Sequence, residues 1–286
     1  MKKGIISNKK GVSAIVTFVL LTTVALVVIG NWLNVAVPEW GSADEERHML
    51  AVQNQLVGLR ASAKGLIYAD NTDFVVPNYV RLGTSGAAWK GVGRANGIIE
   101  FDPQDSSVLF QHMGSNMAAT KGNLQYQSHN LYYPDQDLIF ESGAVIKKQG
   151  GTSAMIAPPD FEASMDGSSI SIRMTMISLT GEKDVISGNI GVLVYTKLVS
   201  REYNIYNWST NDEDIVLDIT TDYPVAWSTY FTTLLPKQGF RQVGPAETPD
   251  DDGEFKIVTT QTKCELTVAN VDRLEATVAV VDIILE

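Results

Sequence analysis

The chain has 286 residues, of which 44% are hydrophobic and 19% are charged. This is enough apolar material for a packed core, and it argues against a disordered chain. A net charge of -11 excludes the many phosphate contacts of a nucleic-acid binder, and the single cysteine, Cys264, excludes an intramolecular disulfide or a cysteine zinc site.

An uncharged apolar run, residues 12–37, follows four lysines at positions 2, 3, 9 and 10. As a helix it would extend about 39 Å, which exceeds the hydrocarbon core of a bilayer, about 30 Å thick. A cleaved secretion signal has an apolar region of only about 7–15 residues. The run therefore predicts a membrane-spanning helix, with the lysines in the cytoplasm and residues 39–286 outside the cell. On the residues alone, a plain signal anchor remains an alternative.

The junction "KKG" followed by "VSAIVTFVLLTTVALVVIG" resembles the class III signal of archaeal type IV pilin-like proteins. The resemblance implies a leader over residues 1–11, removed by a prepilin peptidase between Gly11 and Val12. The helix over 12–37 would then be retained for anchoring or assembly. Bacterial pilins usually carry a Glu at the fifth mature position, where this chain has Val16. The expected assembly face comprises Val16, Val19, Leu20, Val24 and Val27.

A second helix is expected beyond Pro38, because proline ends or kinks a helix. Ser42 and Glu45 have the spacing of a capping box. Apolar residues then recur at helical spacing, which predicts a stalk helix over about 43–67 within a segment 38–70; they are Met49, Val52, Leu56, Leu59, Ala63 and Leu66. This stripe packs either on the downstream domain or on equivalent helices of other copies.

Several blocks along the chain are similar to a family of uncharacterised archaeal pilin-like surface proteins. They are "VPEWGSADEERHMLAVQNQLVGLR", "VRLGTSG", "GIIEFDPQ", "NLYYPDQDLIFESGAVIKKQGG" and "ITTDYPVAWSTYF". The resemblance covers most of the chain. It implies a class and a cell-surface location, and it brings no activity, cofactor or ligand.

The remainder, residues 71–286, is predicted to be an extracellular β-rich domain. Side chains alternate in short runs such as "SISIRMTMISL", which indicates antiparallel strands in one sandwich or two stacked ones. A hairpin is expected around Ser142–Gly143, and the last run, 275–285, is expected to be a central strand. One short helix, about 224–235, is predicted after an Asp222 cap. The expected fold class is α+β.

Catalytic patterns are missing from the sequence. Ser85 and Ser153 are flanked by glycines but do not match the nucleophile-elbow pattern, and the three histidines, His48, His112 and His129, are scattered. Phosphate-binding and dinucleotide-binding glycine motifs are absent. We therefore expect no enzyme, no cofactor and no catalytic or metal-binding residue, with a membrane-anchored hydrolase as a distant alternative.

Three features of the expected exterior leave alternatives open. The carboxylates within 211–218 and 250–254 are either solvated turns or a calcium site. Asn207 begins a glycosylation sequon. The neighbouring aromatics, Tyr203, Tyr206 and Trp208, either pack in the sheet or form a sugar-binding platform.

Together these observations predict a non-enzymatic archaeal cell-surface pilin-like protein that acts in adhesion or surface scaffolding. The expected location is the cell membrane, with an extracellular domain and assembly into a surface filament. The expected partners are a prepilin peptidase, membrane lipid, and other pilin-like subunits or surface-layer components. The competing hypothesis is a monomeric membrane-tethered binding protein that keeps its leader.

Overall fold

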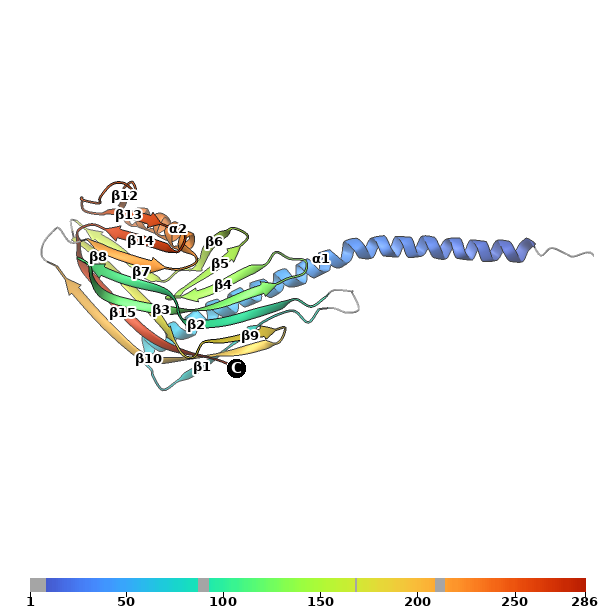
Figure 1. Ribbon diagram of the computed structural model, residues 1–286, viewed down its shortest axis with the longest axis horizontal. Helices are drawn as coiled ribbons and strands as arrows, with labels where there is room; N and C mark the ends of the chain where they lie inside the picture. The colour runs from blue at the N-terminus through green and yellow to red at the C-terminus, as the bar shows by residue number, and fades with distance from the viewer. Residues whose placement is uncertain (1–8, 87–92, 168, 209–213) are drawn as a thin grey trace, which may run out of the picture.

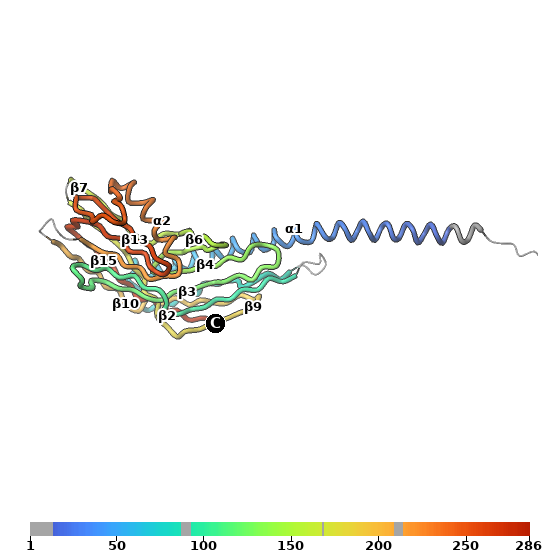
Figure 2. Tube along the Cα trace, turned by 45° about the horizontal axis from the view of Figure 1, so that its top comes forward, coloured from blue at the N-terminus to red at the C-terminus, as the bar shows by residue number. Residues whose placement is uncertain are grey.

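One helix, α1, runs from Lys9 to Ala69 and joins a β-rich domain in an α+β fold (Figure 1). The computed structural model describes residues 9–86, 93–167, 169–208 and 214–286, with side chains from residue 14 onward. The first half of α1 projects from the domain as a lone rod, and both views show it clear of other elements (Figures 1 and 2). Its second half lies along the sheets.

Of the two alternatives for Pro38, ending or kinking the helix, the structure has the second, so the two expected helical segments form one continuous helix. The proline lies inside α1, where it removes one backbone donor and crowds the preceding turn. The rings of Trp32 and Trp40 meet edge to face across it, with centroids 5.3 Å apart. Figure 1 shows the helix changing direction about midway along its length, as expected for a proline kink. Because the helix is continuous, Ser42 is not an N-cap.

A five-stranded sheet has the order β1-β10-β15-β8-β7. Its strands are β1 (Val75–Arg81), β7 (Asp160–Asp166), β8 (Ser169–Thr180), β10 (Gly191–Asn207) and β15 (Val271–Leu285). The last strand lies between β10 and β8, which confirms its predicted central place. It pairs with β8 in parallel, whereas the other pairs in this sheet are antiparallel.

The second sheet has ten strands in the order β12-β13-β14-β11-β2-β3-β4-β5-β6, with β9 also paired to β2. The bounds are β2 (Asn96–His112), β3 (Ser115–His129), β4 (Gln136–Glu141), β5 (Ala144–Gln149), β6 (Thr152–Ala157), β9 (Asp184–Gly188), β11 (Ile215–Thr220), β12 (Arg241–Gln242), β13 (Glu254–Thr259) and β14 (Lys263–Val268). The pairing of the long β2 with β3 has a register shift between Asp102 and Ser107.

The predicted hairpin and short helix are both present. β4 and β5 are joined at Ser142 and Gly143, whose φ angles of 46° and 85° suit a tight hairpin turn. Helix α2 (Pro224–Leu234) continues into a 3-10 turn, η2 (Leu235–Gln238). Its N-cap is Tyr223, without a side-chain capping bond. The Asp222 cap is therefore wrong, because the helix begins one residue later and Pro224 supplies the first turn.

Apolar side chains form two clusters. The first lies among α2 and both sheets, and Trp227, Phe231 and Leu235 of the α2–η2 segment are fully buried in it. The second gathers around the C-terminal half of α1, with side chains from both sheets such as Phe101, Leu138 and Val281. The second cluster holds the helix to the domain.

Candidate functional site: the apolar half of α1 and its seat

The first half of α1 is apolar and exposed. Side chains from Ala14 to Val35 are exposed, except Gly30, which is half-buried. Within the described residues, α1 is the one helix long and apolar enough to cross a membrane, and its most apolar 18-residue window has a mean hydropathy of 2.3 with none of it buried. The hydroxyls of Thr22 and Thr23 donate to the carbonyls of Phe18 and Val19, both at 2.8 Å. Their polarity is therefore satisfied within the helix.

The expected assembly residues lie on this exposed half. Val16, Val19, Leu20, Val24 and Val27 are all more than half exposed. Such a continuous apolar surface is unfavourable in water at roughly 25 cal/mol per Å². It therefore needs a cover outside this single chain, either lipid or another protein.

The second half of α1 packs on the chain's own domain. All six stripe residues are buried there: Met49, Val52, Leu56, Leu59, Ala63 and Leu66. The stripe therefore packs on the downstream domain and not on equivalent helices of other copies, which was the other alternative. The helix surface that the stripe occupies is unavailable to other copies.

We call the contact between this packed half of α1 and the domain the seat. Glu45 fixes the start of the seat to a loop between β3 and β4. Its carboxylate accepts hydrogen bonds from the backbone N–H groups of Leu131 (2.9 Å), Tyr132 (2.8 Å) and Tyr133 (2.7 Å). The side chain is buried, so three charge-assisted bonds replace its hydration. The expected capping box is absent because the loop, not Ser42, supplies the partners of Glu45.

Gly41 permits the same loop to lie against the helix. A Cβ atom at this position would lie 2.2 Å from Cδ2 of the Tyr132 ring, far inside van der Waals contact. Glycine is therefore required here for close approach, four residues before Glu45. Gly58 and Gly65 of the same helix have nothing within 4 Å of such an atom.

His48 belongs to the seat. Its Nε2 lies 3.1 Å from the hydroxyl of Tyr126, which itself donates to the carbonyl of Leu82 at 2.8 Å. Nε2 therefore carries the proton and donates to the Tyr126 oxygen. Burial lowers the pKa of His48, which keeps the ring neutral. His112 and His129 lie at opposite ends of the β2–β3 pair, where His112 faces Ser115 and His129 faces Asn96.

At the other end of the seat, polar side chains of α1 bind Asp160 of the domain. Its carboxylate accepts from Lys64 Nζ (2.6 Å), from Arg60 (3.3 Å) and from the hydroxyl of Tyr68 (3.0 Å). Arg60 also donates to the carbonyls of Gly143 and Pro158. Helix α1 is therefore fixed to the domain at both ends of its packed half.

The remaining predicted positions are dispersed. Gly11 and Val12 lie in the first turns of α1, where side chains are not described. Asn207 is exposed at the end of β10, but the third sequon residue, Ser209, lies outside the described part. Of the acidic segment 211–218, residues 211–213 also lie outside it.

The aromatics near the sequon divide between core and surface. Tyr206 and Trp208 stack with ring centroids 6.2 Å apart and pack against the first cluster, as expected for sheet packing. Tyr203 is exposed. Among the described residues, no group of three or more His, Cys, Asp or Glu side chains is arranged to hold a metal ion.

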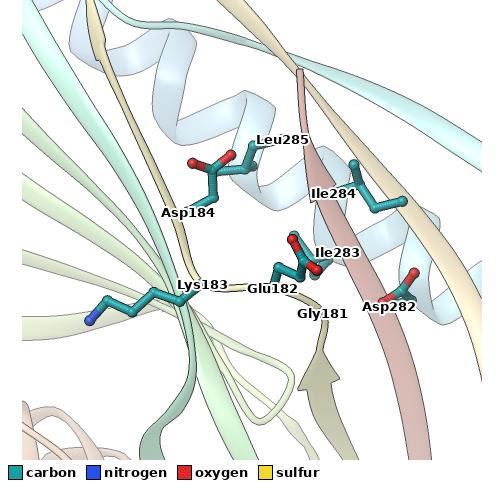
Figure 3. A pocket seen from close by; sticks show the side chains of 8 residues that line it. All are labelled: Gly181, Glu182, Lys183, Asp184, Asp282, Ile283, Ile284 and Leu285. Atoms are coloured by element: carbon teal, nitrogen blue, oxygen red, sulfur yellow. The ribbon is translucent and has the colours of Figure 1, made fainter.

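One hollow of about 560 Å³ lies between the turn after β8 and the end of β15. Figure 3 shows Lys183 pointing away from it, and its Nζ pairs with Asp102 at 2.6 Å. Glu182, Asp184 and Asp282 line the hollow beside the apolar Ile284.

Sequence reasoning missed one buried carboxylate, Glu141. Its Oε1 accepts from the Trp227 indole N–H at 2.7 Å and from the Thr221 hydroxyl at 2.9 Å. Burial raises its pKa to about 7. The position directly before a tight turn suggests exposure, and the sequence carries no signal that α2 covers it.

The profile of one protein family matches residues 95–285, and it is described as a family of unknown function, DUF7289. Because this match spans more than half of the chain, the chain belongs to that family. No curated protein and no solved structure matches the chain significantly.

Proposed function

We propose that this member of the DUF7289 family is a non-enzymatic archaeal cell-surface protein of the type IV pilin-like kind. In this proposal the apolar half of α1 anchors it in the membrane or assembles it with other copies, and the β-rich domain serves adhesion or surface scaffolding outside the cell. The observation that carries the proposal is the exposed apolar helix over residues 14–35.

The two halves of α1 support an anchor with a rigidly attached domain. About 24 residues, 14–37, would extend about 36 Å as a helix, which is enough to span the hydrocarbon core. The lysines at positions 2, 3, 9 and 10 favour the cytoplasmic side. Trp32 and Trp40 lie at the other end of the run, where aromatic side chains favour the membrane interface.

Processing is the first part to test. We propose that a prepilin peptidase removes residues 1–11 and leaves Val12 as the mature N-terminus. Terminal peptide mapping of the native protein, from membrane and sheared-surface fractions, should find chains that begin at Val12. A Gly11→Leu variant should keep its leader, whereas Gly30→Leu, an equal change within the helix, should still be cut. Native chains that begin at Met1 would contradict the pilin-like assignment.

Assembly is the second part. A charge at the centre of the apolar run costs about 2.5–3.5 kcal/mol on insertion scales, and it costs more where helices pack together without water. Val24→Asp should therefore abolish filaments in the sheared fraction, while Val24→Leu should retain them. If both variants stay inserted and the wild type yields no filament, the rival is favoured, a monomeric membrane-tethered binding protein. Its supporting observation is that the stripe of the packed half is occupied by the protein's own domain.

A further inference from the structure

A polar groove lies on the outer face of the five-stranded sheet, beside the end of α1. It has a volume of about 630 Å³, within the range of small-molecule clefts. One row of its side chains crosses four strands in register: Tyr203 on β10 pairs with Thr277, Thr277 with Thr175, and Thr175 with Asp160. A ligand that lies along this row would contact all four strands.

The next row on the same face is charged. Glu275 pairs with Arg173, and Arg173 pairs with Glu162 on the neighbouring strand. Residues two apart on a strand point to the same side, so this row borders the first one. The alternate positions, such as Met174 and Ala276, are buried on the inner face. The groove floor is therefore made of hydroxyls, carboxylates and a guanidinium.

Two tyrosines stand at opposite ends of the first row. The hydroxyl of Tyr68 donates to Asp160 at 3.0 Å, and the hydroxyl of Tyr203 donates to Glu275 at 3.0 Å. Tyr68 and Tyr203 remain 69% and 52% exposed. Their rings can therefore contact a ligand, although hydrogen bonds hold their hydroxyl groups in place. A fixed, exposed aromatic ring offers apolar area at little entropic cost on binding.

The charges of the groove are already paired. Asp160 accepts from Lys64 at 2.6 Å, and Glu275 accepts from Arg173 and Arg273, both at 2.8 Å. The hydrogen bond from Arg173 lowers the pKa of Glu275, which keeps this carboxylate an acceptor at neutral pH. A ligand with a net charge of either sign would meet a charge that already has its partner.

We propose that this groove binds a neutral saccharide. Carboxylate and guanidinium groups each present two or more hydrogen-bonding atoms in a plane, which suits neighbouring sugar hydroxyls. The tyrosine rings suit the apolar C–H face of a pyranose ring. A face built only for solvation needs neither ring, and here two rings from distant parts of the chain flank one polar floor. The inference deepens the proposed adhesion role by naming its ligand class, and it rests on that role for its location only.

The test uses the full chain in lipid nanodiscs, because sugar-headed detergents would compete. An array of neutral and acidic oligosaccharides identifies binders, and calorimetry with the best neutral one gives Kd. We expect Tyr68→Ala and Tyr203→Ala each to weaken binding at least 10-fold, whereas Tyr203→Phe keeps the ring and loses less than 5-fold. Tyr79→Ala is the matched control, since Tyr79 is also 52% exposed and lies on β1 of the same sheet, outside the groove.

Three results would overturn the proposal: no neutral saccharide bound by the wild type, binding confined to acidic saccharides, or affinity that Tyr68→Ala and Tyr203→Ala leave unchanged in variants with wild-type circular dichroism. The outcome is independent of leader removal and filament formation. Failure of the groove and failure of the pilin-like assignment are therefore distinguishable.

Discussion

Oε2 of Glu45 lies 2.7 Å from the backbone nitrogen of Tyr133, and the two residues are 88 positions apart in the chain. This bond and its two neighbours fix the helix to the β3–β4 loop near the point where the apolar run ends. The apolar half of α1 and the domain are therefore joined by tertiary contacts as well as by the chain itself.

Glu45→Ala should lower the free energy of unfolding of the domain by about 2–4 kcal/mol, because three buried backbone donors lose a charged acceptor. Glu46→Ala removes an exposed carboxylate from the next position and should change it by less than about 0.5 kcal/mol. Urea unfolding of the full chain in nanodiscs, followed by tryptophan fluorescence, measures both. Equal effects of the two variants would mean that the Glu45 contacts contribute little.

Gly41→Ala should destabilise the domain, because the new methyl group meets the Tyr132 ring. Overpacking of this kind costs about 1–3 kcal/mol, against a gain in helix propensity of about 1 kcal/mol. Gly58→Ala has open space around it and should stabilise by about 0.5–1 kcal/mol. Melting temperatures of the two variants should shift in opposite directions, and Tyr132→Ala should remove the cost of Gly41→Ala. A stabilising Gly41→Ala would show that the ring is free to move away.

Leu59→Ala should lower the free energy of unfolding by about 2–5 kcal/mol, because Leu59 of α1 is fully buried against side chains of both sheets. Leu50→Ala is the matched control on the same helix, where the side chain is 53% exposed, and it should cost less than about 0.5 kcal/mol. Chemical denaturation separates them. A small effect of Leu59→Ala would indicate that the packed half of α1 detaches readily from the sheets.

Glu141 should make stability depend on pH. Burial raises its pKa from 4.5 in the unfolded chain to about 7 in the folded one, so the folded state holds a proton that the unfolded state releases. Stability from this group is complete below about pH 4.5 and is lost as pH rises through about 7, by roughly 3–4 kcal/mol.

Glu141→Gln keeps the size of the side chain, and its amide provides an acceptor and a donor, as a protonated carboxyl does, but it does not titrate. The difference in unfolding free energy between the wild type and this variant, measured from pH 4.5 to 8, isolates Glu141 from His48, whose lowered pKa acts in the opposite direction. A difference that stays constant across this range would exclude titration of Glu141.

The α+β class, the long apolar helix, the β4–β5 hairpin and α2 could be predicted from the sequence, because each has a local pattern. Alternation identified β8, and the tight turn at Ser142–Gly143 identified the hairpin. The β15–β8 parallel pair could not be predicted, since strand order depends on contacts between segments far apart in the chain.

The helix seat could be predicted only in part. The stripe from Met49 to Leu66 has helical spacing, which identified a packing face but not its partner. Proline chemistry predicted that Pro38 ends or kinks the helix, and which of the two occurs could not be predicted from the sequence; the structure has the kink, with the exposed Pro38 inside α1. Glu45 has the spacing of a capping box, and only the tertiary structure shows that its acceptor atoms meet the 131–133 loop. The groove at Tyr203 depends on register across four strands, which a single sequence does not reveal.

The continuous helix also has a mechanical consequence. A pull on the domain against the apolar half of α1 would load the helix along its axis, so the packed turns and the polar contacts at Glu45 and Asp160 would bear shear together rather than open one by one. We expect the domain to resist extension until these contacts fail cooperatively. Single-molecule stretching between the N-terminus and Glu286 should then show one high-force event, and a series of small events would contradict this expectation.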